Sequence, residues 1–323
     1  MKREFHAQFP LVLRDSVTQG FAIAWLVKQS DHLPARWQEI AQVKDDWARL
    51  EILSQVIITN RKEEARMGTR KMSGGLRYWI ESHSQDFFKQ QINYMKSLNL
   101  LPPLPDLSIF PYGSWAARIT FTLKKPYISR DDKEFYILDN PVKKEWVFKV
   151  PYVAPTQWKG TLRAAMRRLR GYTTWEEEAD DEQMMRLFGN VKGEEQDFSS
   201  GYLHFYPTFF DKIGIEVINP HDRRTGAGRN PIYFECVPAG TVGAFTILYV
   251  PMGVRPVDEN DAKEDIKAVA RGIRTMLTEY GFGAKTSSGY GVGEVKEGDI
   301  VVVPEERRDE FIEGWRNLDD ESV

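Results

Sequence analysis

The chain has 323 residues, of which 41% are hydrophobic, 28% charged and 12% aromatic. This composition is typical of a globular protein and excludes a disordered, collagen-like or coiled-coil chain. Its 44 lysines and arginines nearly balance 47 aspartates and glutamates. A net charge of −3 therefore favours no particular partner, and any nucleic-acid site has to be a local basic patch.

The single cysteine, Cys236, excludes an intrachain disulfide and a thiolate zinc site and is typical of a reducing cytoplasm. Neither a signal-peptide pattern nor an apolar run of about 18 residues is evident, so we expect a cytoplasmic protein without membrane contact. A domain usually takes roughly 100–200 residues, so the length favours two unequal domains.

The N-terminal part of the chain is predicted to be helical. Apolar residues three and four positions apart indicate amphipathic helices within 36–54 and 88–98. Four prolines in the segment 101–113 disfavour helix. We therefore expect a helical extension or docking module over residues 1–113 and a second domain over residues 114–323.

The second domain is predicted to be rich in strands. Ile119, Phe121 and Leu123 alternate with polar residues, which is typical of a half-buried strand. Two long helices interrupt the strands, so we predict an α+β fold of the ferredoxin-like or RNA-recognition type. The expected further strands are 202–210, 213–218, 231–237, 241–250 and 292–303, and the expected helices are 158–170 and 262–280.

Four cations share one predicted face of the helix that begins at Trp158: Lys159, Arg163, Arg167 and Arg170. Such a line of positive charge suits an RNA backbone, with a solvated helix face as the alternative. The acidic run 176–182 would be able to neutralise these cations, but we expect it to be a solvated loop or helix start.

Residues 281–293 place five glycines around Lys285, Ser288 and Tyr290. Glycine lets a backbone approach a phosphate or ribose closely, so we predict RNA binding here, with a tight chain connection as the alternative. The segment is not a P-loop, because Ala284 precedes the lysine.

A second loop, residues 219–229, carries His221, Arg223 and Arg224 between two predicted strands. We expect these side chains to contact nucleic acid from an exposed hairpin. No second base or nucleophile accompanies the histidine, so a binding or structural role is favoured over catalysis.

Three aspartates, Asp131, Asp132 and Asp139, follow the first predicted strand. A carboxylate beside bound RNA acts as a general base or holds a hydrated Mg²⁺, and a solvated loop charge is the default for each of them.

In this order the motifs resemble the RAMP superfamily of CRISPR proteins, specifically the backbone subunits of type III effector complexes. The segment Pro151–Arg163 is similar to the family signature P-x-I-P-G-S-S-x-K-G-x-x-R, although Ala154, Pro155 and Gln157 depart from its glycine and serine elements. Leu187-Phe-Gly189 matches L-F-G, the loop 219–231 stands where relatives carry a thumb hairpin, and 281–293 matches the terminal glycine-rich loop.

The resemblance implies a cytoplasmic ribonucleoprotein subunit of antiviral defence that binds guide RNA and assembles with target RNA and other effector subunits. In catalytic relatives a loop aspartate cuts target RNA with Mg²⁺ or Mn²⁺, and Asp139, before Asn140-Pro141, matches that aspartate. We therefore expect a guide-RNA-binding subunit with Asp139 as candidate catalytic and metal-binding residue. An inert structural subunit and a guide-processing endoribonuclease are the alternatives.

Overall fold

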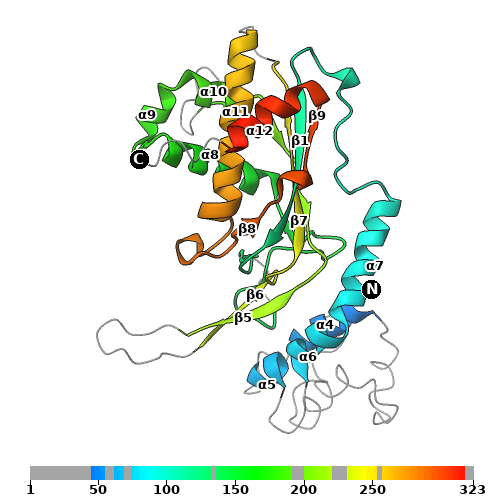
Figure 1. The fold of residues 1–323 in the computed structure, drawn as a ribbon. Helices are drawn as coiled ribbons and strands as arrows, with labels where there is room; N and C mark the ends of the chain where they lie inside the picture. The colour runs from blue at the N-terminus through cyan, green and yellow to red at the C-terminus, as the bar shows by residue number, and fades with distance from the viewer. Residues whose placement is uncertain are drawn as a thin grey trace, which may run out of the picture. The chain divides into compact units, whose positions relative to one another are not determined.

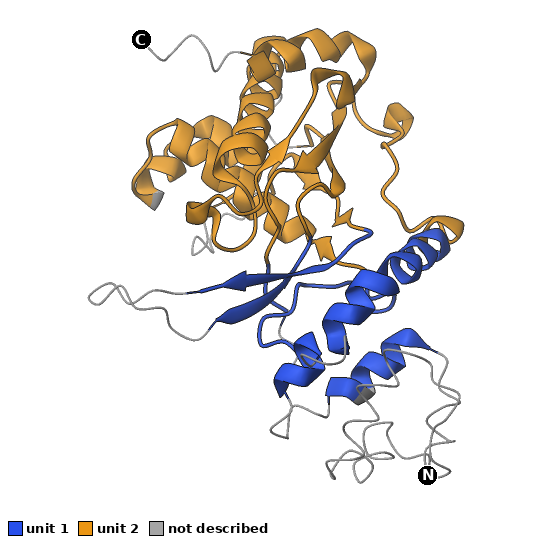
Figure 2. Ribbon diagram, turned by 60° about the horizontal axis from the view of Figure 1, so that its bottom comes forward, with its two compact units in different colours: residues 1–94, 129–149, 211–237 blue, residues 95–128, 150–210, 238–323 orange. Residues whose placement is uncertain are grey.

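The computed structural model describes residues 45–54, 62–68, 74–131, 136–190, 200–219, 231–252 and 257–316. Figure 2 shows two compact units, each assembled from three stretches of the chain. Unit 1 contains residues 1–94, 129–149 and 211–237, and unit 2 contains 95–128, 150–210 and 238–323. The units thus interleave along the chain. The predicted boundary between residues 113 and 114 concerns domains that fold independently, and it stays a prediction.

The sheet of unit 2 is built around β1 (Trp115–Leu123), as Figure 1 shows. On one side β1 pairs antiparallel with β7 (Val242–Tyr249), which also pairs with β3 (Leu203–Phe205). On the other side β1 pairs antiparallel with β8 (Gly293–Glu294) and β9 (Ile300–Val303). The strand order is β3-β7-β1-β8.

The order of elements in unit 2 defines its fold class. In the chain, helix α8 (Pro155–Leu169) lies between β1 and β3, and α11 (Glu259–Thr275) lies between β7 and β8. Counting the strands of this sheet and these two long helices, the succession is β-α-β-β-α-β, and the antiparallel sheet has the ferredoxin-like strand order. The predicted α+β fold of the ferredoxin-like type is confirmed, and a helical N-terminal region is present as well.

Helices α8 and α11 cover one face of the sheet (Figure 1). The core beneath α8 is aromatic: the Trp158 ring lies 4.6 Å from that of Phe282 and 5.0 Å from that of Phe245. The helices approach closely at Gly272, where a Cβ atom would lie 2.5 Å from Cγ of Met166. Burial of these side chains fixes which face of α8 remains accessible.

The proline-rich segment packs against buried residues of the sheet. Leu104, Leu107 and Phe110 contact a cluster that contains Ala116 and Leu248. Apolar burial therefore explains why this stretch is ordered although it contains no α-helix or strand. The other elements of unit 2 are β2 (Tyr152–Val153), β4 (Thr208–Phe209), α9 (Trp175–Ala179), α10 (Glu182–Phe188), α12 (Arg308–Arg316), the π-helical turn η4 (Met276–Tyr280), and the 3-10 turns η3 (Leu107–Ile109), η5 (Thr286–Ser288), η6 (Glu297–Asp299) and η7 (Glu305–Arg307).

Unit 1 combines short helices with one β-hairpin. Trp47, Trp79 and Phe88 are among its buried apolar residues. Strand β5 pairs antiparallel with β6, with Ile218 opposite Ile232. The elements are α4 (Asp46–Ser54), α5 (Lys62–Met67), α6 (Gly75–Ser82), α7 (Ser84–Ser97, which ends in unit 2), β5 (Gly214–Ile218) and β6 (Ile232–Cys236).

The predicted elements are found with local differences. The strand expected over 202–210 is two short strands, since Pro207 between them lacks a backbone donor. The strand expected over 292–303 is interrupted by η6, and the helix expected over 262–280 ends as a π-helical turn. Residues 36–44 of the first predicted helix lie outside the described residues. In the described part of the chain, no helix combines the length and apolarity needed to span a membrane.

Candidate nucleic-acid interface

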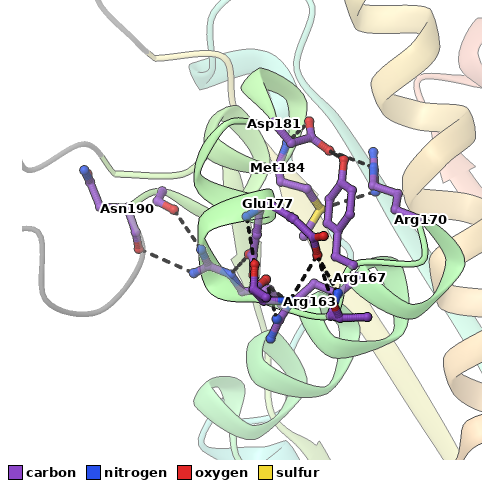
Figure 3. Close-up of polar contacts among 12 residues, drawn as sticks. Arg163, Arg167, Arg170, Glu177, Asp181, Met184 and Asn190 are labelled. Carbon is purple, nitrogen blue, oxygen red and sulfur yellow. Dashed lines mark hydrogen bonds and ion pairs between the residues drawn. The ribbon is translucent and has the colours of Figure 1, made fainter.

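Three of the four cations predicted to line α8 are paired with acidic residues of α9 and of the start of α10 (Figure 3). Arg163 and Arg167 both bind Glu178, whose side chain is fully buried, and Nε of Arg167 lies 3.0 Å from its carboxylate. Nε of Arg170 lies 2.8 Å from the carboxylate of Asp181. The expectation of an exposed line of cations is wrong for these three arginines, because part of the acidic run neutralises them instead of being solvated.

Arg163 also connects two sequence motifs. Its Nη2 donates to the carbonyl oxygen of Gly189 at 3.2 Å and its Nη1 donates to that of Asn190 at 3.4 Å. Gly189 ends α10 with a φ of 80°, and Leu187 and Phe188 before it are buried. The arginine of the signature therefore holds the L-F-G motif in place.

Lys159, the fourth cation, has a different environment. It is half-buried, and within the described residues no carboxylate forms an ion pair with it. Burial, and then the neighbouring charge of Arg163, lower the pKa of Lys159 below its ordinary value of 10.5. This lysine is available for an anionic ligand.

The accessible face of α8 is the one that carries Thr156, Gly160, Ala164 and Arg168, four positions spaced by one helical turn. A Cβ atom at Gly160 would meet no other atom within 4 Å, so this position opens to space. The guanidinium carbon of Arg168 lies 4.9 Å from the ring centre of Tyr280. An exposed, oriented arginine therefore stands at one end of a face with small side chains.

A groove of about 320 Å³ separates this face from the glycine-rich loop. The loop has a fixed shape: the N–H of Ala284 donates to the carbonyl of Ile128 at 2.7 Å, and that of Gly291 donates to Pro126 at 2.9 Å. Gly283 has a φ of 91°, and a Cβ atom there would lie 2.4 Å from the oxygen of Ile128. The groove is lined by Thr156, Gln157, Gly160, Thr161, Ala164, Ala165, Arg168, Tyr280, Gly281, Phe282, Gly283 and Thr286.

The predicted loop residues are not among those that line the groove, but they belong to the loop that forms one of its walls. Lys285 is exposed with a left-handed φ of 60°, Ser288 is exposed at the end of η5, and Tyr290 is half-exposed. Nζ of Lys125, from the chain after β1, lies 3.2 Å from the carbonyl oxygen of Ser288. The loop and α8 thus bring Lys125, Arg168 and Lys285 to one region of unit 2.

Sequence reasoning missed Arg168 and Lys125. Arg168 was predictable from its position two helical turns after Gly160, because the positions between them on that face carry no large apolar side chain and the face is therefore expected to be accessible. The signal for Lys125 did not exist locally, because 163 residues separate it from Ser288. The residues His221, Arg223 and Arg224 lie outside the described residues, between the paired strands β5 and β6.

Asp139 lies in unit 1 and holds two cations of α5. Its Oδ1 is 2.6 Å from Nζ of Lys62, and its Oδ2 is 2.8 Å from Nη2 of Arg66. Burial opposes ionisation, but the hydrogen bonds and charges of Lys62 and Arg66 outweigh it and hold the pKa of Asp139 below its ordinary value of 3.8. The carboxylate is ionised at neutral pH and is still 60% exposed.

The loop that carries Asp139 is fixed to β6. The carbonyl of Asn140 accepts from the N–H of Glu235 at 2.9 Å, and the Asn140 side chain donates to the carbonyl of Tyr233 at 3.3 Å. Arg66 is buried and also donates to the carbonyl of Ile137 at 2.9 Å. Asp139 therefore has a defined position.

The side chains that surround Asp139 do not fit a Mg²⁺ or Mn²⁺ ion. Hard divalent cations need several oxygen ligands, whereas both oxygens of Asp139 contact a positive charge. Among the residues that the structure describes, no group of three or more His, Cys, Asp or Glu side chains is placed to hold a metal. Asp132, a neighbouring candidate, lies outside them.

Comparison with known proteins agrees with the motifs. The model of the RAMP superfamily matches residues 49–294, well over half of the chain. The chain belongs to the RAMP superfamily. The resemblance drawn from the motifs is confirmed at this level, and the match begins within α4, so most of the described N-terminal helices lie inside it.

Individual relatives of this RAMP protein are similar over part or most of its length. CRISPR system Cms endoribonuclease Csm3 of Streptococcus thermophilus is 28% identical over an alignment of 167 residues, and the alignment covers 48% of this chain and 73% of that protein. A chain of the type III-B Cmr-beta complex bound to cognate target RNA has a TM-score of 0.45 at 17% identity, covering 89% of both chains. A chain of a CRISPR RNA-guided surveillance complex has a TM-score of 0.38 at 16% identity, covering 56% of this chain and 66% of that one.

Proposed function

We propose that this RAMP protein is a guide-RNA-binding backbone subunit of a type III CRISPR effector complex. The observation that carries the proposal is the groove between the exposed face of α8 and the glycine-rich loop. The similarity to Csm3 of Streptococcus thermophilus supports the assignment to a type III complex. Guide RNA, target RNA and the other effector subunits are the partners proposed with it.

The groove suits an RNA backbone for two physical reasons. Gly160 and Ala164 keep one wall free of large side chains, so a sugar-phosphate chain is able to approach the helix. Arg168 lines the groove and Lys285 precedes Thr286 of its lining, so both supply positive charge there, while Lys159 is a further cation on the Arg163 side of α8. Each phosphate contact adds affinity that depends on salt and not on sequence. Arg163, Arg167 and Arg170 have internal partners, so we assign them a structural role instead.

The proposal is tested by RNA binding of the purified full-length chain at several salt concentrations. Replacing Arg168 and Lys285 by alanine is expected to weaken binding of a short single-stranded RNA and to lower the salt slope by about one unit for each lost phosphate contact. Copurification of a short RNA from a host that carries the whole locus is the second expected result. Unchanged affinity and slope in the double variant would contradict the proposed interface.

Cutting of target RNA at Asp139 with Mg²⁺ or Mn²⁺ is the second candidate function. It is favoured by the exposed carboxylate of Asp139 on a fixed loop and by the similarity to Csm3, which is named an endoribonuclease. The contacts of Lys62 and Arg66 oppose it, because a divalent ion would have to displace them. An inert RNA-binding subunit is therefore the first candidate, and a guide-processing nuclease is the last.

The enzyme reading has a direct test. The assembled complex is incubated with target RNA and Mg²⁺ or Mn²⁺, with wild-type protein and with Asp139→Ala. Loss of a metal-dependent cut in the variant would establish the activity, and absence of any cut with the wild-type protein would leave the structural subunit.

A further inference from the structure

Trp146 is highly exposed, with 84% of its surface accessible. It lies in unit 1, in the turn that follows the Asp139 loop, and Val147 beside it is 69% exposed. A large aromatic ring in water costs free energy that burial would recover. Its exposure on an ordered turn therefore indicates a binding role.

The turn is rigid. The carboxylate of Glu145 accepts hydrogen bonds from the N–H groups of Val147 at 2.8 Å and Phe148 at 2.6 Å. The N–H of Lys149 donates to the carbonyl of Glu145 at 3.0 Å, and Lys149 has a left-handed φ of 59°. Because its backbone is fixed, the turn presents Trp146 with a small entropy cost on binding.

Trp146 is also the outer end of an alternating series of rings and cations. Nζ of Lys149 lies 5.0 Å from the ring centre of Trp146 and 5.9 Å from that of Trp47. Nζ of Lys144 lies 5.6 Å from the Trp47 ring and 4.7 Å from the Tyr136 ring. We call these five side chains the aromatic–lysine ladder.

The inner end of the ladder is anchored in the core of unit 1. Glu235, which is fully buried, binds Lys144 and accepts a hydrogen bond from the hydroxyl of Tyr136 at 2.5 Å. The backbone N–H of Val142 donates to the same carboxylate at 3.0 Å. The ladder therefore links the exposed ring to a buried network whose polar groups are paired.

We propose that Trp146, supported by Lys149, is a stacking platform for an unpaired nucleobase of the RNA that this protein binds. The inference rests on the proposed RNA-binding function and adds a contact in unit 1. Every nucleobase offers an aromatic face, so a single ring serves without sequence preference. The turn also has the right sign of charge: Lys144 is paired with Glu235, and of the remaining charged residues in the segment 143–149 two are lysines and one is a glutamate.

The experiment uses the full chain and single-stranded RNAs that carry 5-iodouridine at successive positions. After irradiation and trypsin digestion, the cross-linked peptide is identified by mass spectrometry; cleavage after Lys144 and Lys149 isolates residues 145–149. We expect a cross-link in this peptide, and its loss in Trp146→Ala. A matched control is Tyr112→Ala, since Tyr112 is 92% exposed in unit 2 and has no place in the ladder.

Affinity distinguishes stacking from charge. Trp146→Ala is expected to lower RNA affinity about tenfold with an unchanged salt slope, as stacking involves no phosphate. Trp146→Phe should retain most of the affinity, and Tyr112→Ala all of it. Because Trp146 is exposed, the thermal stability of Trp146→Ala and of Trp146→Phe should equal that of wild type.

The failures of the two proposals differ. If the wild-type chain binds no RNA, both fall. If RNA binding depends on Arg168 and Lys285 but is the same in Trp146→Ala, with no cross-link in the peptide, only the stacking platform is overturned. Loss of association with a neighbouring effector subunit in Trp146→Ala, with RNA binding intact, would overturn it in favour of a protein contact.

Discussion

The guanidinium of Arg163 donates a hydrogen bond to the carbonyl oxygen of Gly189, with Nη2 and O 3.2 Å apart. The same side chain binds the buried carboxylate of Glu178. Arg163, which the motif resemblance assigns to RNA binding, thus holds α8, α9 and the end of α10 together. Loss of its side chain is therefore expected to lower the stability of unit 2.

Arg163→Ala is expected to destabilise unit 2 by about 3–5 kcal/mol, because Glu178 loses one of its two cations while it stays buried. Urea unfolding followed by circular dichroism measures the change. Arg168→Ala is the matched control on the same helix, and its free energy of unfolding should stay within about 0.5 kcal/mol of wild type. The reverse pattern, a stable Arg163→Ala with weak RNA binding, would contradict the structural role.

Gly160→Ala should separate folding from binding. Alanine favours a helix interior over glycine by about 1 kcal/mol, and a Cβ atom has open space here, so the free energy of unfolding should rise. RNA affinity should fall, and Gly160→Leu should reduce it further, since the larger side chain fills the groove. Filter binding of a short RNA checks this, and an unaffected Gly160→Leu would mean that RNA does not use the groove.

Much of the fold was predictable from the sequence because local periodicity carries the signal. Alternation over β1 and the spacing of Trp158, Leu162 and Met166 on α8 report which side chains are buried. Together with the order of elements, they determine the ferredoxin-like class. Pro207, which lacks a backbone donor, is itself a sequence signal for the interruption between β3 and β4.

The candidate site was predictable only in part. A helical pattern gives the angle at which Arg163 leaves α8, but it does not say which element lies opposite, and α9 brings Glu178 there. Likewise, 77 residues separate Lys62 from Asp139, so no local pattern indicates their contact. The sequence predicts which residues are charged, whereas tertiary packing decides which charges are left for a ligand.

Arg66→Ala should be more harmful than Lys62→Ala, although both remove an ion pair with Asp139. The side chain of Arg66 is 6% exposed and also donates to Ile137, whereas that of Lys62 is 34% exposed. We expect a loss of about 2–3 kcal/mol for Arg66→Ala, from the hydrogen bonds of a buried charged group. An exposed ion pair contributes under about 1 kcal/mol to the free energy of unfolding, so Lys62→Ala is expected to lose no more than this. Equal losses in urea unfolding would contradict this ranking.

The charge of Asp139 gives a prediction of pH dependence. Its pKa in the folded protein is below the ordinary value of 3.8, because Lys62 and Arg66 stabilise the ionised form. A depressed pKa contributes stability that is fully present above the unfolded-state pKa and is lost as the pH falls through the folded-state pKa. The carboxylate of Asp139 is therefore expected to contribute to folding stability at neutral pH, although the sequence alone predicts no such contribution for a loop aspartate.

Comparison of wild type with Asp139→Asn from pH 7 to pH 2.5 tests this dependence. The difference in free energy of unfolding should be constant above about pH 5, because the carboxyl group is ionised there in both the folded and the unfolded state. It should shrink as the pH falls below about 4, where the unfolded chain takes up the proton first. Because the carboxylate is 60% exposed, solvent screening limits the difference to under about 1 kcal/mol. In a Lys62→Ala, Arg66→Ala background the loss of stability on acidification should disappear, because burial of Asp139 then acts alone and raises its pKa, which favours the protonated form at low pH. A loss of the same sign as in wild type that persists there would place the relevant titration at another group and would remove the two cations as its cause.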